Sequence, residues 1–233
     1  MPIPTRAYII HLPDDTRRIR NVKRLTYALQ AAGVSHVEVV LGVRPQDRGP
    51  MYSVGEWGCY QSHLACLRRI AADPGAGSGL VLEDDAVLST TPDDLRAMLS
   101  GTINWDFLHV GYLSNTVFRA WDADLLSREA LRVRGVLYGL QCYAASPEGL
   151  AERCDALERL PFEPASEGGG VGADGALCEL SWRDPSLVRL APPRSLFHTL
   201  AGTRSSIRPT SARQRAVEST REAARQLKMR IAS

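Results

Sequence analysis

The first 41 residues constrain the fold more than any other part of the chain. An apolar run at residues 6–12 is stopped by Pro13, as is typical of a buried strand. Residues 16–32 then carry apolar side chains at helical spacing, and Gly33 ends that segment. A second apolar run follows at 37–41. A strand, a helix and a strand in close succession predict a parallel sheet with helices packed on its faces.

The remainder of the chain continues this alternation. We expect helices over 55–72, 146–160 and 173–182, a helix beginning at Thr91, strands at 79–82, 105–113 and 187–190, and two short strands within 132–145. A chain of 233 residues suits one domain with an appendage. We therefore predict a single α/β domain over residues 1–207, with a mostly parallel central sheet, and a basic helical tail over 208–233.

Composition and charge exclude several classes of protein. Hydrophobic residues are 44% and charged residues 23% of the chain, which argues against wholesale disorder. The five cysteines are scattered, so we expect free thiols and no disulfide framework. No apolar run approaches the ~18 residues that span a bilayer, and the N-terminus resembles neither a signal nor a transit peptide. We expect a cytoplasmic protein.

The net charge of +2 is unevenly distributed, because basic residues concentrate after residue 203 and the preceding body is net acidic. We therefore expect no nucleic-acid partner for the body. The tail could lie on an anionic membrane surface, which would make membrane association at most peripheral. It lacks the large apolar residues that such helices bury, so a solvated or packed terminal helix is the alternative.

The strongest local motif is the acidic run Glu83, Asp84 and Asp85, which directly follows the apolar residues 80–82. Three adjacent acids at the end of a buried strand raise one another's pKa or bind a cation. Ligands of open α/β sheets bind at the carboxyl ends of strands. Oxygen ligands select Mg²⁺ or Mn²⁺, and substrate phosphates often complete such sites. A solvated turn after an edge strand is the alternative reading.

The predicted helix 55–72 places Cys59, His63 and Cys66 on one face. These residue types could bind zinc, but no second cysteine pair has a zinc-site spacing. We expect core thiols and a hydrogen-bonded His63 instead. A nucleophilic dyad of Ser62 and His63 is not expected, because adjacent helical residues do not face each other.

Two later segments could return to the mouth of the sheet. His198 precedes a run at 202–206 that could offer Arg204, hydroxyls and backbone amides to a phosphate. Asp174 ends a glycine-rich stretch at 161–174, whose glycines could act as hinges of an active-site lid. A plain loop is the alternative in both cases.

Taken together, these segments resemble glycosyltransferase family 25, which includes bacterial lipooligosaccharide and animal collagen galactosyltransferases. The resemblance covers roughly residues 6–207. The matching stretches are Tyr8–Pro13 with Arg17 and Arg18, Gly55–Leu64, Leu82–Asp85 and, more weakly, Leu108–Tyr112 and 135–150. The helix containing Cys59, Ser62 and His63, followed about twenty residues later by the acidic run, is its most specific part.

The resemblance implies a glycosyltransferase A-type fold and an inverting transfer from a UDP-sugar, with galactose or glucose as the hexose. It implies that Asp85 binds Mn²⁺ or Mg²⁺ on the donor diphosphate, with His198 as a second metal ligand. Asp174 is the candidate general base, with Glu167 and Glu179 as rivals. The candidate donor contacts are His11, Leu12, Arg17, Ser62, His63, Glu83, Asp84, Arg204 and Ser205.

The chain also departs from the family pattern. His11 stands where the family usually has Asn, Val43 and Arg44 replace an acidic-glycine turn, and residues 165–173 are unusually rich in glycine. The acceptor, a hydroxyl of a glycan, a peptide or a small metabolite, therefore stays open. A catalytically silent binding module is one alternative function. A nucleotidyltransferase is another, although Pro13, Asp14 and Asp15 stand where it would need a basic, glycine-rich phosphate loop.

Overall fold

The computed structural model describes residues 3–51, 53–101, 103–112, 123–125, 130–133, 137, 139–159 and 172–200. The helices are α1 (Ile19–Ala31), α2 (Val54–Ala72), α3 (Pro92–Leu99), α4 (Leu150–Glu158) and α5 (Ala173–Arg183), with 3-10 helices at Thr16–Arg18 and Pro74–Ala76. The strands are β1 (Arg6–His11), β2 (His36–Leu41), β3 (Gly79–Glu83), β4 (Ala86–Leu88), β5 (Phe107–Gly111), β6 (Ala123–Leu125), β7 (Leu131–Val133), β8 (Cys142–Ala145), β9 (Arg189–Ala191) and β10 (Phe197–Thr199).

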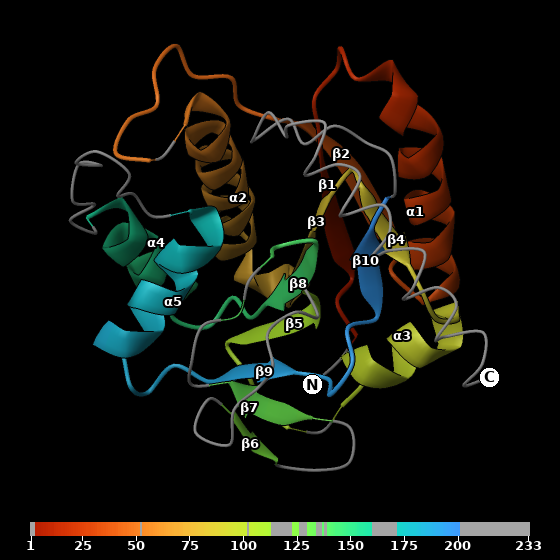
Figure 1. Cartoon of the computed structure of the whole chain (residues 1–233). Coiled ribbons are helices and arrows are strands. Elements are labelled where there is room, and N and C mark those ends of the chain that lie inside the picture. Colours follow the sequence, from red (N-terminus) through yellow and green to blue (C-terminus); the bar gives the residue numbers. More distant parts are fainter. Residues whose placement is uncertain are drawn as a thin grey trace.

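The described strands form one sheet between two layers of helices (Figure 1). The strand order is β2-β1-β3-β8-β5-β9-β7-β6, with β10 pairing β4 and β5. Strands β1, β2 and β3 are parallel neighbours, β5 and β9 share their direction, and β8 runs antiparallel between β3 and β5. The predicted α/β fold with a mostly parallel central sheet is confirmed.

Alternation along the strands divides the core between the two faces of the sheet. On β1, Tyr8 joins the core cluster formed with α2, α4 and α5, whereas Ala7 and Ile9 join the cluster formed with α1 and α3. On β3, Val81 belongs to the first cluster and Leu82 to the second. A strand buried on both faces explains why these runs are continuously apolar.

Side chains in the sequence account for where the helices begin. The Ser53 hydroxyl accepts a hydrogen bond from the Glu56 amide, so α2 begins at residue 54. Thr91 and Asp94 form a reciprocal capping box at the start of α3, as the helix start predicted there requires.

The prediction was least accurate for short strands and for the connection around residue 140. Strands β4, β6 and β10 were not predicted, and each has three residues. The two strands expected within 132–145 exist as β7 and β8, but β8 lies at the centre of the sheet while β7 pairs β6 and β9. The helix expected from residue 146 begins at Leu150.

The remaining predictions about the tail and the loops cannot be compared with the structure. The tail at 208–233, the glycine-rich stretch at 161–171 and the run at 202–206 lie outside the described residues. Among the residues that are described, no helix is long and apolar enough to cross a membrane.

Candidate active site at the carboxyl edge of the sheet

The acidic run lies at the topological switch point of the sheet, where successive strands are added on opposite sides of β1. From β1 the chain passes through α1 to β2 on one side, and it later enters β3 on the other side of β1. The parallel register pairs Ile10 near the end of β1 with Glu83 at the end of β3. Ligands of open α/β sheets bind in the crevice at such a switch point.

The three acids do not converge on a single point. Glu83 follows Val81 by two residues on the α2 face, and Asp84 follows Leu82 by two residues on the α1 face. Asp85 comes after the strand has ended, in the turn that leads to β4. Glu83 therefore has partners of its own, whereas Asp84 and Asp85 share Arg18.

Asp84 is buried and fully engaged by neighbouring side chains. Its Oδ1 lies 2.5 Å from Arg18 Nη1, and its Oδ2 lies 2.7 Å from His11 Nδ1. The Asn21 amide donates hydrogen bonds to the main-chain oxygens of Asp84, at 2.8 Å, and Ala86, at 2.7 Å. Side chains that precede and begin α1 thus hold the turn after β3 in place.

Asp85 is also buried, but only one of its carboxylate oxygens has a partner. Its Oδ2 lies 3.1 Å from Arg18 Nη2, whereas its Oδ1 is buried without a hydrogen bond. Burial, followed by the charge of Glu83, raises the pKa of Asp85 to about 7, even though Arg18 acts in the opposite direction. Asp85 therefore shares Arg18 with Asp84 and keeps one buried acceptor oxygen without a hydrogen-bond partner.

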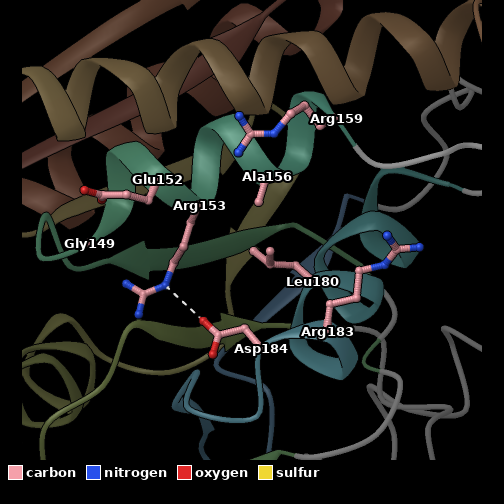
Figure 2. Close-up of a pocket in the computed structure, with 8 residues that line it drawn as sticks. All are labelled: Gly149, Glu152, Arg153, Ala156, Arg159, Leu180, Arg183 and Asp184. Carbon is pink, nitrogen blue, oxygen red and sulfur yellow. Dashed lines mark ion pairs between the residues drawn. The ribbon is translucent and has the colours of Figure 1, made fainter.

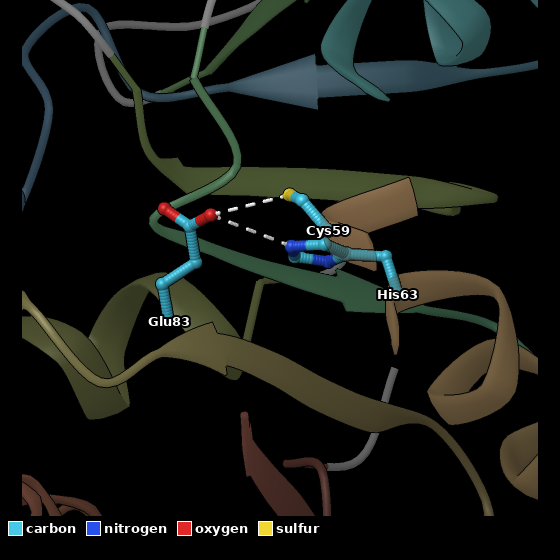
Figure 3. Close-up of side chains that lie close together, drawn as sticks. All are labelled: Cys59, His63 and Glu83. Carbon is cyan, nitrogen blue, oxygen red and sulfur yellow. Dashed lines mark hydrogen bonds and ion pairs between the residues drawn. The ribbon is translucent and has the colours of Figure 1, made fainter. Parts of the chain in front are cut away.

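Glu83 faces α2, where Cys59 and His63 approach the same carboxylate oxygen (Figure 3). Its Oε1 lies 3.5 Å from Cys59 Sγ and 3.7 Å from His63 Nε2. Burial alone would raise the pKa of Glu83, but His63 and Cys59 outweigh it and lower that pKa. Burial, with the charge of Glu83, raises the pKa of the Cys59 thiol well above its usual value.

Strand β10 brings His198 close to the acidic run. It pairs antiparallel with β4, so that His198 lies opposite Val87, and the Leu200 amide donates to the Asp85 main-chain oxygen at 2.7 Å. His198 Nδ1 is buried without a hydrogen-bond partner. The strand that carries the expected second metal ligand therefore borders the turn that carries the first.

Asp174 lies in the first turn of α5, beside the acidic residues of the α2 face. Its Oδ2 accepts a hydrogen bond from the Gly139 amide at 3.0 Å. A Cβ added at Gly172 would lie 2.8 Å from Asp174 Oδ1 and 3.3 Å from Glu56 Oε2, so Asp174 and Glu56 border the same small space. The charge of Asp174 also acts on Cys59.

The two rivals of Asp174 differ from it in position. Glu167 lies outside the described residues. Glu179 Oε1 pairs with Arg183 Nη2 on the same helix at 2.8 Å, and both side chains are at least one third exposed. Asp174 is therefore the acid of the described part of α5 that approaches Cys59.

The other expected donor contacts have more local roles in this structure. The main-chain oxygen of Leu12 accepts from the Asp15 amide, and the exposed Arg17 pairs with the Asp15 carboxylate. The Ser62 hydroxyl donates to the Gly58 main-chain oxygen at 2.6 Å and accepts from the Val43 amide at 2.8 Å. Two further residues lie outside the described part: Arg204 and Ser205.

Sequence reasoning selected Arg17, whereas the structure buries Arg18 against both aspartates. The position of Arg18 relative to the buried residues of α1 could have identified it from the sequence. Arg18 precedes Val22 by four residues and Leu25 by seven, so it continues the buried stripe of α1 toward the acidic run. Ile19, an apolar residue of the predicted helical segment, is instead 41% exposed.

Gln141 was also missed. Its main-chain oxygen accepts from the Glu83 amide at 3.2 Å, and its Nε2 lies 3.4 Å from Thr199 Oγ1 on β10. It follows Gly139, whose amide contacts Asp174. Gln141 therefore connects the acidic run, the strand of His198 and the first turn of α5, and a single glutamine before a short strand gives no sequence signal for this role.

Two buried atoms at this edge are candidate ligands of a divalent cation. Asp85 Oδ1 is a buried carboxylate oxygen without a partner, and His198 Nδ1 is a buried imidazole nitrogen without one. Carboxylate oxygens suit Mg²⁺ and Mn²⁺, and imidazole suits transition metals. Asp84, which is held by Arg18 and His11, is a less available ligand.

A separate hollow of about 490 Å³ lies between α4 and α5 (Figure 2). The ion pair of Arg153 Nε with Asp184 Oδ2, 4.0 Å apart, borders it. Its lining comprises Gly149, Glu152, Arg153, Ala156, Arg159, Leu180, Arg183 and Asp184. None of these residues belongs to the acidic run or its partners, so the hollow is distinct from the candidate active site.

No family model and no curated protein matches this chain. Among solved structures, it is similar to a glycosyltransferase involved in glycosylation of the major capsid of PBCV-1, at 10% identity, over 67% of each chain and with a TM-score of 0.43. A197 from STIV is 12% identical over 84% of this chain and 83% of its own, with a TM-score of 0.43. The apo-form glycosyltransferase GlyE of Streptococcus pneumoniae TIGR4 is 12% identical over 81% of this chain and 45% of its own, with a TM-score of 0.41.

Proposed function

We propose that the protein is an inverting, metal-dependent glycosyltransferase that moves a hexose from a UDP-sugar to an acceptor hydroxyl. Galactose and glucose are the proposed sugars, and a glycan, a peptide or a small molecule is the proposed acceptor. The observation that carries the proposal is the buried, unpartnered Oδ1 of Asp85 at the switch point of the sheet. Burying a carboxylate costs desolvation free energy, and an acid that is buried in spite of this cost is characteristic of a functional site.

The surroundings of Asp85 support a role in binding a diphosphate. Mn²⁺ or Mg²⁺, held by Asp85 and His198, would supply positive charge to the leaving diphosphate. Arg18 fixes the orientation of Asp85 through its contact with Oδ2, and Asn21 holds the turn that carries it. His11, which braces Asp84 at the end of β1, lies on the side where we propose that the donor binds.

Asp174 is the proposed general base. In an inverting transfer, the acceptor oxygen bonds to the anomeric carbon while the bond from that carbon to the diphosphate breaks, and the acceptor proton passes to Asp174. The first turn of a helix, with amide hydrogen bonds to the carboxylate, orients this acid. Arg17, Ser62, His63, Glu83, Arg204 and Ser205 remain proposed donor contacts, together with the Leu12 backbone.

Release of UDP tests the proposal without knowledge of the acceptor. We would incubate the protein with a panel of UDP-sugars in Mn²⁺, in Mg²⁺ and in EDTA, and measure UDP by a coupled assay. One donor should be hydrolysed slowly, with a requirement for metal. The isosteric variant Asp85→Asn should lose this activity, whereas Asp93→Asn, whose side chain is 86% exposed, should retain it.

A binding measurement decides the case in which no donor turns over. Calorimetric titration of UDP in the presence of Mn²⁺ should give binding that Asp85→Asn weakens. Binding without turnover would indicate that the reaction lacks its acceptor, and absence of UDP binding would contradict the transferase and favour the catalytically silent module.

A further inference from the structure

Three side chains on the α2 face of the sheet meet in a geometry that donor binding alone does not explain, although two of them, His63 and Glu83, are also proposed donor contacts. These are Cys59 and His63 of α2 and Glu83 at the end of β3 (Figure 3). One ligand atom from each lies within 4.8 Å of the other two. We propose that Cys59, His63 and Glu83 bind a zinc ion, separate from the cation proposed at Asp85.

Two of the three separations between the ligand atoms agree with tetrahedral coordination. Zinc bonds of about 2.3 Å to sulfur and about 2.0–2.2 Å to nitrogen and oxygen, at tetrahedral angles, put neighbouring ligand atoms roughly 3.3–3.6 Å apart. Cys59 Sγ lies 3.5 Å from Glu83 Oε1, and His63 Nε2 lies 3.7 Å from the same oxygen. These two separations are within a few tenths of an ångström of the tetrahedral values, and the third, between Cys59 Sγ and His63 Nε2, is within 4.8 Å.

The His63 ring is oriented for coordination. Its side chain is 5% exposed, and its Nε2 is buried without a hydrogen bond while it faces Glu83 and Cys59. Its other ring nitrogen, Nδ1, lies 3.1 Å from the hydroxyl oxygen of Tyr143, and the two rings stack. Histidine ligands of metals usually have such a partner on the second nitrogen, which fixes the direction of the ring.

The backbone supplies this arrangement without a loop. Cys59 and His63 are four residues apart, so they lie on one face of α2, and Glu83 is the last residue of a buried strand. Cys66, which shares that face in the sequence, is instead packed in the hydrophobic core. Ligands on a helix and a strand are held more firmly than ligands on loops.

The local charge also favours a cation. Besides Glu83, the carboxylates of Glu56 and Asp174 act electrostatically on Cys59. Among the described residues the set has three members, so water completes a tetrahedral site. Sulfur, imidazole and a single carboxylate form a ligand set that suits zinc better than magnesium. Zinc here would tie α2 to the strand that ends in the acidic run.

Cobalt provides a direct probe, because a thiolate bound to Co²⁺ absorbs in the near ultraviolet. We would strip the purified full chain with a chelator, titrate it with Co²⁺ and then add Zn²⁺. We expect a thiolate charge-transfer band from one Co²⁺ per chain, besides any Co²⁺ bound at Asp85, and loss of that band when Zn²⁺ displaces the cobalt. Absence of that band in the unmodified protein would overturn the proposal.

Matched variants assign the band to these residues. Cys59→Ala should abolish it, whereas Cys66→Ala, on the same helix, and Asp85→Asn, in the other proposed cation site, should keep it. A band that survives in folded Cys59→Ala, or that Asp85→Asn removes, would overturn the assignment. If circular dichroism shows Cys59→Ala unfolded, Glu83→Gln decides: Co²⁺ affinity should fall at least about tenfold, and unchanged affinity would contradict the site.

Discussion

Arg18 and Asp84 form a buried ion pair, in which Arg18 Nη1 lies 2.5 Å from Asp84 Oδ1 and the side chains are 6% and 5% exposed. The same guanidinium also reaches Asp85 Oδ2 at 3.1 Å. Burial alone would lower the pKa of Arg18, but Asp85 and Asp84 outweigh it and raise that pKa. One arginine thus offsets part of the negative charge of two neighbouring acids while leaving an oxygen of Asp85 without a partner.

Replacing this arginine should destabilise the protein severely. Arg18→Met should lower the free energy of unfolding by about 3–5 kcal/mol, because it leaves buried carboxylates without their counterion. Arg17→Met is the matched control, since Arg17 has a 66% exposed side chain and pairs only with Asp15 among the described residues. It should change stability by less than about 1 kcal/mol. Urea unfolding at neutral pH measures both, and equal losses would contradict the role of Arg18.

The identity of this arginine illustrates what the sequence determines here. Helical periodicity predicted α1 correctly, but at its N-terminal end the buried side chain is Arg18, and the apolar Ile19 is exposed. An arginine on the buried stripe can be recognised only if its counterion is known. That counterion lies 66 residues away, and the pairing depends on how β3 packs beside β1.

Prediction of the strands was likewise limited by contacts between distant parts of the chain. Runs of five or six residues, such as β1 and β3, have apolar patterns that predict them directly. Strands of three residues, such as β4 and β10, carry no periodicity, and β10 forms because its partners are present. Position within the sheet is also non-local, which is why the central position of β8 escaped prediction. The acidic run was recognised in the sequence. That Glu83 and Asp84 lie on opposite faces of the sheet follows from the alternation of side chains along β3.

Asp85 should make the metal-free protein less stable as pH rises. Its pKa in the folded state is about 7, above the ordinary value of 3.8, so the folded state holds a proton that the unfolded state has released. Its contribution therefore becomes unfavourable between about pH 4 and pH 7. Asp85→Asn should raise the free energy of unfolding by on the order of 1–4 kcal/mol at pH 8, and by little at pH 4.

The neighbouring acid provides the control. Asp84→Asn should lower stability at pH 8, because Arg18 and His11 lose a charged partner. Thermal unfolding in EDTA at pH 4, 6 and 8 compares the two isosteric changes. If Asp85→Asn proved as destabilising as Asp84→Asn at pH 8, Asp85 would be a structural acid rather than one held for a ligand.

Asp174 should be needed for transfer but not for donor binding. Asp174→Asn keeps the size of the side chain and one of the two oxygens that accept from the Gly139 and Gly175 amides, so we expect the fold to be preserved. Loss of a general base should lower kcat by about 10²–10⁴ while the KM for the donor stays within a few-fold. Glu179→Gln, on the outer part of the same helix, should leave both unchanged. A change in KM alone would identify Asp174 as a binding residue.

Asn21 should stabilise the turn that carries Asp85. Its amide satisfies the main-chain oxygens of Asp84 and Ala86, and its side chain is buried. Asn21→Ala leaves these two acceptors unpaired, which should cost about 1–3 kcal/mol of unfolding free energy. Lys23→Ala, on the exposed side of α1, should have an effect within about ±0.5 kcal/mol.

Asn21→Ala also shows whether Asn21 supports cation binding at Asp85 or only the stability of the fold. If Asn21 positions Asp85 for a cation, Mn²⁺ affinity measured by calorimetry should fall in Asn21→Ala even at a temperature where the variant is fully folded. Lys23→Ala should then bind Mn²⁺ as the unmodified protein does. If affinity were unchanged while stability fell, the turn would hold its shape through Arg18 alone, and Asn21 would contribute only to folding. Because the Asn21 amide reaches main-chain oxygens on both sides of Asp85, we expect affinity and stability to fall together.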